Sequence, residues 1–315
     1  VISGGIHAFA TGKSFYESDD ILSAMFPAIP GAVKRPDGCS VRSEPFDPVQ
    51  LDEINTPPLF GLAQIERISA SALALHSTKR SFAKIGREFE GKFDGTGIGR
   101  LRSLGSKGVG KFGWKGQFAT IEEFVANACA MELGLTNPLA AQPVPKQFVR
   151  DDAAELDMSR KQLFQLVAFV KDLPPPQQVI PSHPKAAARV HAGEKVFSSI
   201  GCADCHVPNI GGLEGVYSDF HLYEVEDDEV ADSYVEPDFS PEFTLPFHHP
   251  RPSEWKTPPL WGVADSAPYF HDGNSPTLTA AILRHGRDGR HARDNFKALP
   301  QQDKVALIAF LRSLR

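Results

Sequence analysis

The stretch "SSIGCADCHVPN", residues 198–209, contains two of the four cysteines of this 315-residue chain, and a histidine directly follows the second. Cys202, Cys205 and His206 have the spacing C-x-x-C-H, which is typical of covalent attachment of a c-type haem. Two thiols three positions apart can each bond one vinyl group of the haem, and the adjacent histidine can bind the iron. The motif therefore predicts a covalently held haem c with His206 as the proximal iron ligand.

Two other chemistries use a similar pair of cysteines. A structural zinc site usually has four protein ligands, but the remaining cysteines, Cys39 and Cys129, lie far away in the sequence and form no second pair. A thioredoxin-like redox pair would lie in a βαβ pattern, and no such pattern surrounds this motif. Haem attachment is favoured over both alternatives, and the oxidation state of Cys39 and Cys129 stays open.

The sequence on both sides of the motif predicts helices. "AGEKVFSSIG", residues 192–201, has the apolar spacing of a short helix that ends at Gly201. "QQDKVALIAFLRSLR", residues 301–315, predicts a helix at the end of the chain, with arginines in its last turn. A helix before the haem anchor and another at the chain end resemble the cytochrome c fold, from about residue 190 to 315.

Three phrases occur twice in the same order along the chain. They are "NTPPLFG" (55–61) and "KTPPLWG" (256–262), "KGQFATI" (115–121) and "DGNSPTL" (272–278), and "LVAFVKDL" (166–173) and "LIAFLRSL" (307–314). Such turns and apolar helices can also arise by convergence. The shared order favours an internal duplication, and we expect a mainly α fold of two tandem cytochrome c-like domains with long loops, over 1–180 and 181–315. "LPPPQQVIPSHP", residues 173–184, is then the linker between them.

The first of these domains has no C-x-x-C-H motif of its own. Counting back from the repeated phrases places its haem histidine near residue 5 or upstream. The chain begins at Val1 rather than at a methionine, which indicates a processed or truncated product. We therefore expect either a second haem c attached upstream of Val1 or a first domain that has lost its haem.

Composition and charge exclude several classes of partner. The net charge of −6 gives no basic surplus for nucleic acid, and no apolar run approaches the roughly 18 residues of a membrane span. "GSKGVGKF" (105–112) begins like a phosphate-binding loop but has phenylalanine where magnesium would need Ser or Thr, so we expect a flexible basic loop. The acidic segment 223–243 predicts a surface insertion that could dock a basic electron donor.

The sequence closely resembles the di-haem cytochrome c peroxidase superfamily, and within it the di-haem oxidoreductase branch. The resemblance is carried by "INTPPLFGL", "KFGWKGQFATIEEFVANACAMELGLTN", "GEKVFSSIGCADCHVP", "EWKTPPLWGVADSAPYFHDGNSPTLTAAILRHG" and "ALIAFLRSL". In that family an N-terminal haem reacts with peroxide and a C-terminal haem relays electrons. The resemblance implies a peroxide-reducing oxidoreductase; the alternatives are a mono-haem electron carrier with a vestigial first domain and a haem enzyme that oxidises a protein or an organic substrate.

The resemblance also proposes a second iron ligand. Fourteen positions after His271 the family's peroxidases have a methionine, and this chain has His285. Thr277 and Gly286 are a plausible N-cap and C′ residue for the helix that ends there. We expect His285 to bind the iron, which gives a bis-histidine haem of lower potential than a His/Met one; the alternative is a histidine that only favours the helix end electrostatically. We expect His271 to lie at the haem edge or next to an iron ligand, without binding the iron itself.

The helix predicted over residues 120–134 carries a candidate catalytic acid. Glu132 is the next position on its apolar stripe, which consists of Ile121, Val125 and Ala128. A partly buried carboxyl at the negative end of a helix should have a raised pKa, which suits proton transfer to peroxide, and the family's distal acid lies close to this position. The alternative is an exposed glutamate in a frayed last turn. Phe124 stands where the peroxidases have glutamine, a departure from the family pattern.

Two more roles follow only from the resemblance. Trp114 matches a tryptophan between the haems that helps electrons cross, although ordinary core packing is the alternative and is compatible with that role. Asn55, with the backbone carbonyls of Ser266 and Pro268, matches the family's interdomain calcium site. Three oxygens are too few for calcium without added waters.

The partners that we expect are a small electron-donor protein (cytochrome c or a cupredoxin), hydrogen peroxide or another small oxidant, and a homodimer partner or other subunit. Because c-type haem is attached outside the bacterial cytoplasm, the compartment implied is periplasmic or cell-surface.

Overall fold

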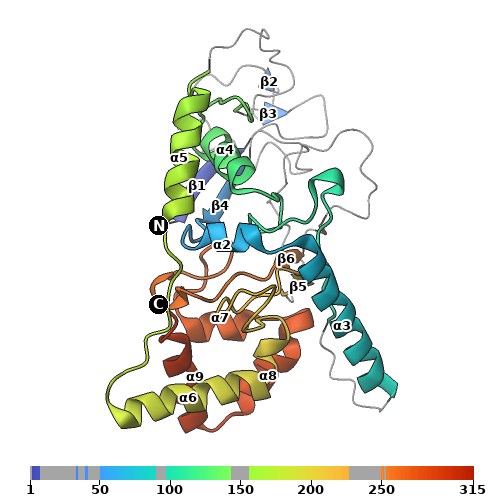
Figure 1. The fold of residues 1–315 in the computed structure, drawn as a ribbon, viewed down its shortest axis with the longest axis vertical. Coiled ribbons are helices and arrows are strands. Elements are labelled where there is room, and N and C mark those ends of the chain that lie inside the picture. The colour runs from blue at the N-terminus through green and yellow to red at the C-terminus, as the bar shows by residue number, and fades with distance from the viewer. Residues whose placement is uncertain are drawn as a thin grey trace.

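The computed structural model describes residues 55–82, 97–142, 156–226, 250–251 and 253–315, together with the backbone of four strands before residue 55 and of one helix as far as Phe89. The fold is mainly helical, as predicted (Figure 1). Its helices are α2 (Leu62–Arg67), α3 (Ala70–Phe89), α4 (Ile121–Glu132), α5 (Arg160–Asp172), α6 (Pro184–Ser199), α7 (Leu278–Arg284), α8 (Arg290–Ala298) and α9 (Gln301–Leu311). Its strands are β1 (Ile2–His7), β2 (Val33–Lys34), β3 (Ser40–Val41), β4 (Gln50–Asn55), β5 (Leu222–Glu224) and β6 (Glu254–Lys256).

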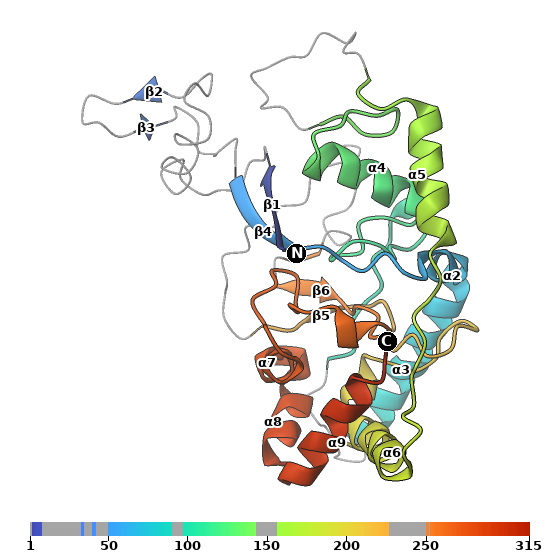
Figure 2. The ribbon, with the colours of Figure 1, turned by 90° about the vertical axis from the view of Figure 1, so that its left-hand side faces the viewer.

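The strands form three small antiparallel pairs rather than one sheet. β1 pairs with β4, from Ile2 opposite Asn55 to His7 opposite Gln50, and β2 pairs with β3. β5 pairs with β6, with Tyr223 opposite Trp255. Figures 1 and 2 show α4 and α5 at one end of the molecule, α6 to α9 at the other, and β5 and β6 between them. The β5–β6 pair therefore lies where the two ends of the molecule meet.

Each end of the molecule is built around its own cluster of buried apolar side chains. The first is centred on α2, α4 and α5, and the second on the packing of α6 against α9. Four residues of the first cluster come from the sequence after residue 180: Ile210, Val216, Phe220 and Trp261. The two halves therefore share apolar contacts, and a domain boundary at residue 180 stays a prediction.

The repeated phrases have similar local conformations. Gly61 and Gly262, which end the two "TPPL" phrases, have φ angles of 69° and 73°, in the left-handed region that glycine adopts most easily. Thr120 and Thr277 are both extended N-cap residues whose side-chain oxygen accepts a hydrogen bond from the backbone N–H three residues later. Both helix starts were predicted from the sequence.

Helix α6 is longer than the helix predicted over 192–201, because it begins at Pro184. Proline is favoured in a first helical turn, where its missing N–H has no intrahelical partner to lose. The predicted linker before it is fixed to the end of the chain, since the N–H of Val179 donates to the carbonyl of Ser313 at 2.7 Å. The linker thus runs along one side of the molecule from α5 to α6 (Figure 1).

The crossing of α6 over α9 is close at Gly193. A methyl group built on Gly193 would lie 2.0 Å from the carbonyl oxygen of Ala306 and 2.8 Å from Cβ of Phe310. Only glycine fits at that distance. Phe197, one turn further along α6, packs its ring against that of Phe310 with centroids 5.3 Å apart.

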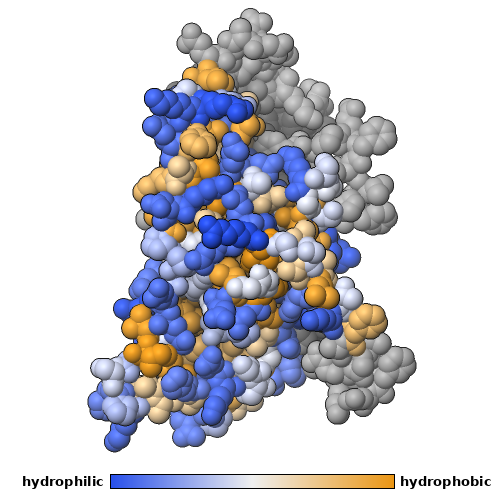
Figure 3. Space-filling view, in the orientation of Figure 1, coloured by the Kyte–Doolittle hydropathy of each residue, from blue (hydrophilic) through white to orange (hydrophobic). Residues whose placement is uncertain are grey.

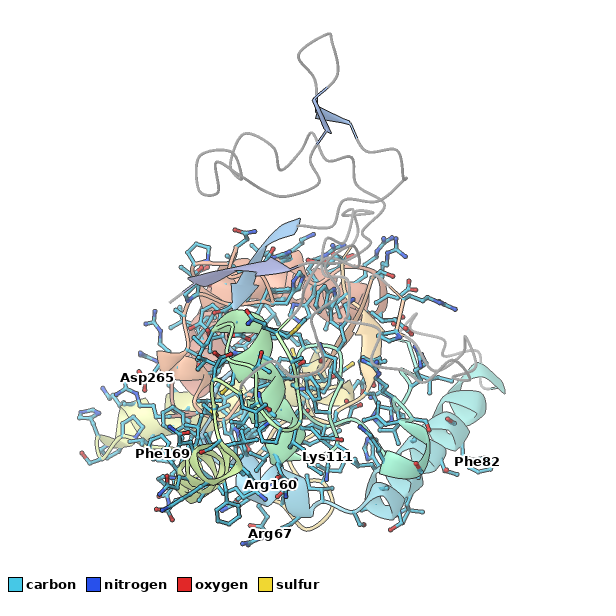
Figure 4. All side chains as sticks on the ribbon, turned by 90° about the horizontal axis from the view of Figure 1, so that it is seen from above. Arg67, Phe82, Lys111, Arg160, Phe169 and Asp265 are labelled. Carbon is cyan, nitrogen blue, oxygen red and sulfur yellow. The ribbon has the colours of Figure 1, made fainter. Side chains whose placement is uncertain are left out.

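Polar and apolar side chains are interspersed on the face seen in Figure 3. Phe82 on α3 and Phe169 on α5 are among the most exposed aromatic residues, at 70% and 61%, and Figure 4 shows Phe82 pointing away from the body of the molecule. Within the described ranges, no helix has the length and apolar character needed to cross a membrane.

Candidate functional site: a haem-binding pocket

A cavity of about 500 Å³ lies beside the C-x-x-C-H motif. Cys202, Cys205, His206 and His285 all line it, although about 80 residues separate the last of them from the others. Most of its wall is apolar; the segment 255–271 supplies many of the lining residues, and α6, α7 and α9 contribute Phe197, Leu278, Ile282, Leu307 and Leu311. An apolar cavity with a few convergent polar groups is typical of a cofactor site.

His206 is an uncharged imidazole with one ring nitrogen available to bind a metal. Its Nδ1 lies 3.1 Å from the carbonyl oxygen of Tyr217 and must donate to it, because a carbonyl can only accept. The free electron pair is therefore on Nε2. Burial lowers the pKa of His206 to about 4, so the ring is uncharged at neutral pH. Histidines that bind metals characteristically donate their other ring N–H to such a carbonyl.

His285 has the same arrangement on the other side of the cavity. It directly follows the last residue of α7, and its Nδ1 donates to the carbonyl of Ala281 at 2.7 Å. Burial lowers its pKa as well. The helix therefore ends one residue earlier than predicted, and Gly286 does not have the left-handed conformation of a C′ glycine; its N–H donates instead to the carbonyl of Val225.

The spacing of the two imidazoles fits one iron between them. Their ring centroids are 6.4 Å apart. With a metal–nitrogen bond of about 2 Å and about 1.1 Å from that nitrogen to the ring centre, two rings on opposite sides of a metal would be about 6.3 Å apart. Among the described residues no group of three or more His, Cys, Asp or Glu side chains could hold a metal ion by itself. The residues present thus fit a haem better than a zinc ion.

Arg284 fixes the end of the helix that carries His285. Its guanidinium makes two hydrogen bonds to the carboxylate of Asp272, at 2.7 and 2.8 Å, and a third to Glu226. Burial would raise the pKa of Asp272, but the hydrogen bonds from Arg284 and Asn274 outweigh it and hold that pKa below its ordinary value. The same guanidinium lies 4.5 Å from the ring centre of Phe270, which contacts His285 edge-on.

His271 lines the cavity but pairs with a tryptophan. Its ring lies 3.4 Å from that of Trp255 and is nearly parallel to it, at 6°. His271 Nε2 is 3.4 Å from Glu226, and Lys115 Nζ lies 3.8 Å from the centre of a Trp255 ring. The stack forms part of the cavity wall next to β6, and a haem-edge role for His271 stays a prediction.

Trp114 and Asn55 lie in the same part of the wall. Trp114 Nε1 donates to the Asn55 carbonyl at 2.7 Å, and Asn55 Nδ2 donates to the carbonyls of Pro268 and Phe270 at 2.6 and 2.9 Å. Ser266 also lines the cavity. The Asn55 amide thus satisfies the Pro268 carbonyl without a cation, and calcium binding at these residues stays a prediction.

Glu132 lies away from the cavity, at the end of α4, and it is exposed rather than partly buried as expected. Glu132 shares the helix face of Ile121, Val125 and Cys129, but it is the last residue of α4 and is left uncovered there. Neighbouring protein atoms nevertheless displace enough water to raise the pKa of Glu132. Its catalytic role stays a prediction, because the cavity does not include it and the segments 90–96 and 143–155 lie outside the described residues.

A buried polar cluster beside Cys205 was missed by the sequence analysis. The side chains of Arg80, Asp219 and Tyr223 meet there. Burial raises the pKa of Cys205 to about 12, and Arg80, whose Nη2 is 3.8 Å from the sulfur, opposes that shift. The interpretation of 223–243 as a surface insertion is wrong for its first residues, because Tyr223 is only 2% exposed and Glu226 only 6%. Cys39 and residues 227–243 lie outside the described residues.

Comparison with known proteins gives a match to part of the chain. Residues 176–314 match the family described as "Di-haem oxidoreductase, putative peroxidase". The cytochrome c peroxidase Ccp of Escherichia coli (strain K12) is 31% identical over 135 residues, which are 40% of this chain and 25% of that protein. The chain therefore spans about a quarter of the length of this curated relative.

Two solved structures show weaker likeness. A hydrazine synthase of Kuenenia stuttgartiensis has 18% identity and a TM-score of 0.42, over 71% of this chain and 79% of its own. A MauG-like protein associated with microbial copper homeostasis has 19% identity and a TM-score of 0.39, over 65% and 69%. Neither likeness is close enough to bear on fold or function. The family match, in contrast, takes in Cys202, His206 and His285, and this part of the chain is similar to the di-haem oxidoreductase family.

Proposed function

We propose that the protein is a c-type haem oxidoreductase of the peroxidase type, whose C-terminal haem relays electrons for the reduction of hydrogen peroxide. The observation that carries the proposal is the pair of His206 and His285, two neutral imidazoles with centroids 6.4 Å apart across a cavity lined by Cys202 and Cys205. A haem bound there would supply one-electron chemistry at its iron.

The chain's own residues have three tasks in this proposal. Cys202 and Cys205 would hold the haem covalently, so that it stays in place even if the fold loosens. The carbonyls of Tyr217 and Ala281 orient the two imidazoles by accepting their Nδ1 protons. The apolar wall from α6, α7 and α9 excludes water, which strengthens the electrostatic control of the iron's potential.

The wall next to β6 is the exit for electrons in this proposal. Trp114, Trp255 and His271 line the cavity there, on the side that faces the half of the molecule built on α4 and α5. Reduction of peroxide to two waters needs two electrons and two protons. Glu132 is the proposed proton donor to peroxide in the half of the molecule built on α4 and α5. The second haem, at which peroxide would react, would be attached upstream of Val1.

Two other functions would use the same pocket. A mono-haem electron carrier is favoured by the pairing of His206 and His285, since a haem iron held by both imidazoles would have no free position for peroxide. A haem enzyme that oxidises a protein or an organic molecule would use the same wall of aromatic side chains. The periplasm or cell surface, a cytochrome c or cupredoxin donor, and a calcium ion at Asn55 belong to the proposal as well.

The test is peroxide consumption by protein made from the full-length gene in a host that matures c-type cytochromes. With a reduced small cytochrome c as donor, we expect donor oxidation that depends on hydrogen peroxide, and a variant with His206→Ala should lose it. A Cys129→Ala variant, changed outside the pocket, should keep it. A haem-loaded protein that leaves both donor and peroxide unchanged would refute the peroxidase and favour the carrier.

A further inference from the structure

Tyr223 joins the haem cavity to a buried carboxylate. Its ring lines the cavity and is 2% exposed. Its hydroxyl donates to Oδ2 of Asp219 at 2.6 Å, whereas the next acceptor, the carbonyl of Ile98, is 3.2 Å away. Asp219 itself is completely buried. The Tyr223 phenol is therefore already hydrogen-bonded to a carboxylate that can accept its proton, and that carboxylate is shielded from water.

The surroundings hold this pair in one geometry. A methyl group on Gly99 would lie 2.4 Å from the Tyr223 ring, so glycine at that position lets the ring seat against the backbone. Asp219 Oδ1 accepts from the N–H of His221 at 3.0 Å, and Oδ2 also accepts from Arg80 Nη1 at 3.2 Å. The carboxylate is thus oriented by protein donors without help from solvent.

Charge near the ring decides which oxidised form of Tyr223 is accessible. The Arg80 guanidinium lies 5.2 Å from the ring centre, and such a cation would repel a tyrosine radical cation in a buried site. Burial raises the pKa of Tyr223 strongly, so the phenol is protonated before oxidation. An electron can therefore leave the ring only if the proton leaves as well, and Asp219 is placed to take it.

We propose that Tyr223 is a one-electron donor to the haem cavity and that Asp219 is its proton acceptor. In this step the Tyr223 O–H bond breaks, its electron passes to the oxidant, and its proton moves along the existing hydrogen bond to Asp219 Oδ2. The products are a neutral Tyr223 phenoxyl radical, a neutral Asp219 and an oxidant reduced by one electron. The inference rests on the proposed function, because the oxidant is a haem centre that hydrogen peroxide has oxidised.

The position of Tyr223 favours transfer to a haem. Arg80, which pairs with Asp219, reaches the haem anchor with its other terminal nitrogen. Arg80 Nη2 lies 3.8 Å from the Cys205 sulfur and 3.1 Å from the Gly97 carbonyl oxygen. The same guanidinium lies 5.2 Å from the centre of the Tyr223 ring, so Arg80 contacts both the Cys205 sulfur and the phenol ring. The phenol thus lies near one of the two points where the porphyrin would be bonded to the chain.

The two other described tyrosines of this half each lack one of these features. Tyr269 lines the cavity, but its hydroxyl donates to the Val263 carbonyl, which is a poor proton acceptor. Tyr217 donates to the carboxylate of Glu194 at 3.2 Å, but it is not among the residues that line the cavity. Tyr269→Phe and Tyr217→Phe are therefore matched controls for Tyr223→Phe. Each change removes one hydroxyl and keeps the ring.

The test is freeze-quench electron paramagnetic resonance on the haem-loaded protein from the full-length gene. One arm uses hydrogen peroxide, and the other uses a photogenerated ruthenium(III) polypyridyl complex, which oxidises without peroxide. Ring-deuterated tyrosine identifies a phenoxyl signal by narrowing it. Haem content and thermal melting of each variant are measured first, so that a lost signal is not a lost fold.

We expect a phenoxyl signal that Tyr223→Phe abolishes and that both control variants keep. A signal in the ruthenium arm alone would refute peroxide chemistry but support Tyr223 as the donor. A haem-loaded protein whose phenoxyl signal survives Tyr223→Phe, or that forms none in either arm, would overturn the inference and leave the proposed function standing. A protein that attaches no haem would overturn both.

Discussion

Gly193→Ala should destabilise the protein, although alanine is the better helix former. Gly193 lies inside α6, where that helix crosses α9. An added methyl group would lie 2.0 Å from the Ala306 carbonyl oxygen, and atoms in contact need about 3.5 Å. The two helices would therefore have to move apart by about 1.5 Å. Leu307, directly after Ala306, lines the haem cavity, so the cavity wall would move as well.

The expected magnitude is the difference of two opposing effects. Replacing glycine by alanine within a helix favours folding by about 1 kcal/mol. Overpacking a close contact usually costs about 1–3 kcal/mol and sometimes more, and here the clash is with backbone, which cannot rotate away. We expect a net loss of about 2 kcal/mol, which in a chain of 315 residues lowers the melting temperature by about 3 °C.

The assay is thermal melting of the haem-loaded protein, followed by circular dichroism. Ser198→Ala on the exposed face of α6 is the control, and its melting temperature should be unchanged or slightly higher. If Gly193→Ala melts at or above the wild-type temperature, the gain in helix propensity has outweighed the cost of the steric clash where α6 crosses α9. The packing of α6 on α9 would then not have the closeness described.

Two further predictions concern the end of α7. His285→Met should change the spectrum from bis-histidine towards His/Met and raise the midpoint potential, and an unchanged spectrum would exclude His285 as a ligand. Asp272 is ion-paired with Arg284, and its pKa is lowered in the folded state. It therefore adds stability above the unfolded-state pKa of about 3.9, and this contribution is lost as the pH falls further towards the folded pKa. Asp272→Asn should lower the melting temperature at pH 7 and make less difference near pH 3, and a pH-independent difference would refute the assignment.

The sequence predicted what depends on short spacings. The C-x-x-C-H motif, the N-caps Thr120 and Thr277 and the helix before the haem anchor are each contained within about one or two helical turns, where local rules apply. The family resemblance supplied the distance from His271 to His285, and iron binding by His285 stays a prediction. The structure places His206 and His285 around one cavity.

The sequence analysis failed where burial depends on distant segments. Tyr223 lies in a run of acidic residues that reads as surface, yet pairing with β6 and contact with Arg80, 143 positions earlier, bury it. Trp255 is likewise covered by His271 and Lys115 from other parts of the chain. Glu132 was misplaced for a smaller reason. It shares a helix face with Val125 and Cys129, but it is the last residue of α4 and is exposed.

Mass spectrometry of the proteolytic peptide that contains Cys202 and Cys205 tests the central claim most directly. The protein should be made from the full-length gene in a host with c-type cytochrome maturation, and the peptide isolated after denaturation. The account predicts one haem bonded to that peptide, with its visible absorption retained, and none when both cysteines are changed to serine. A peptide with two unmodified thiols, or with a disulfide between them, would contradict it.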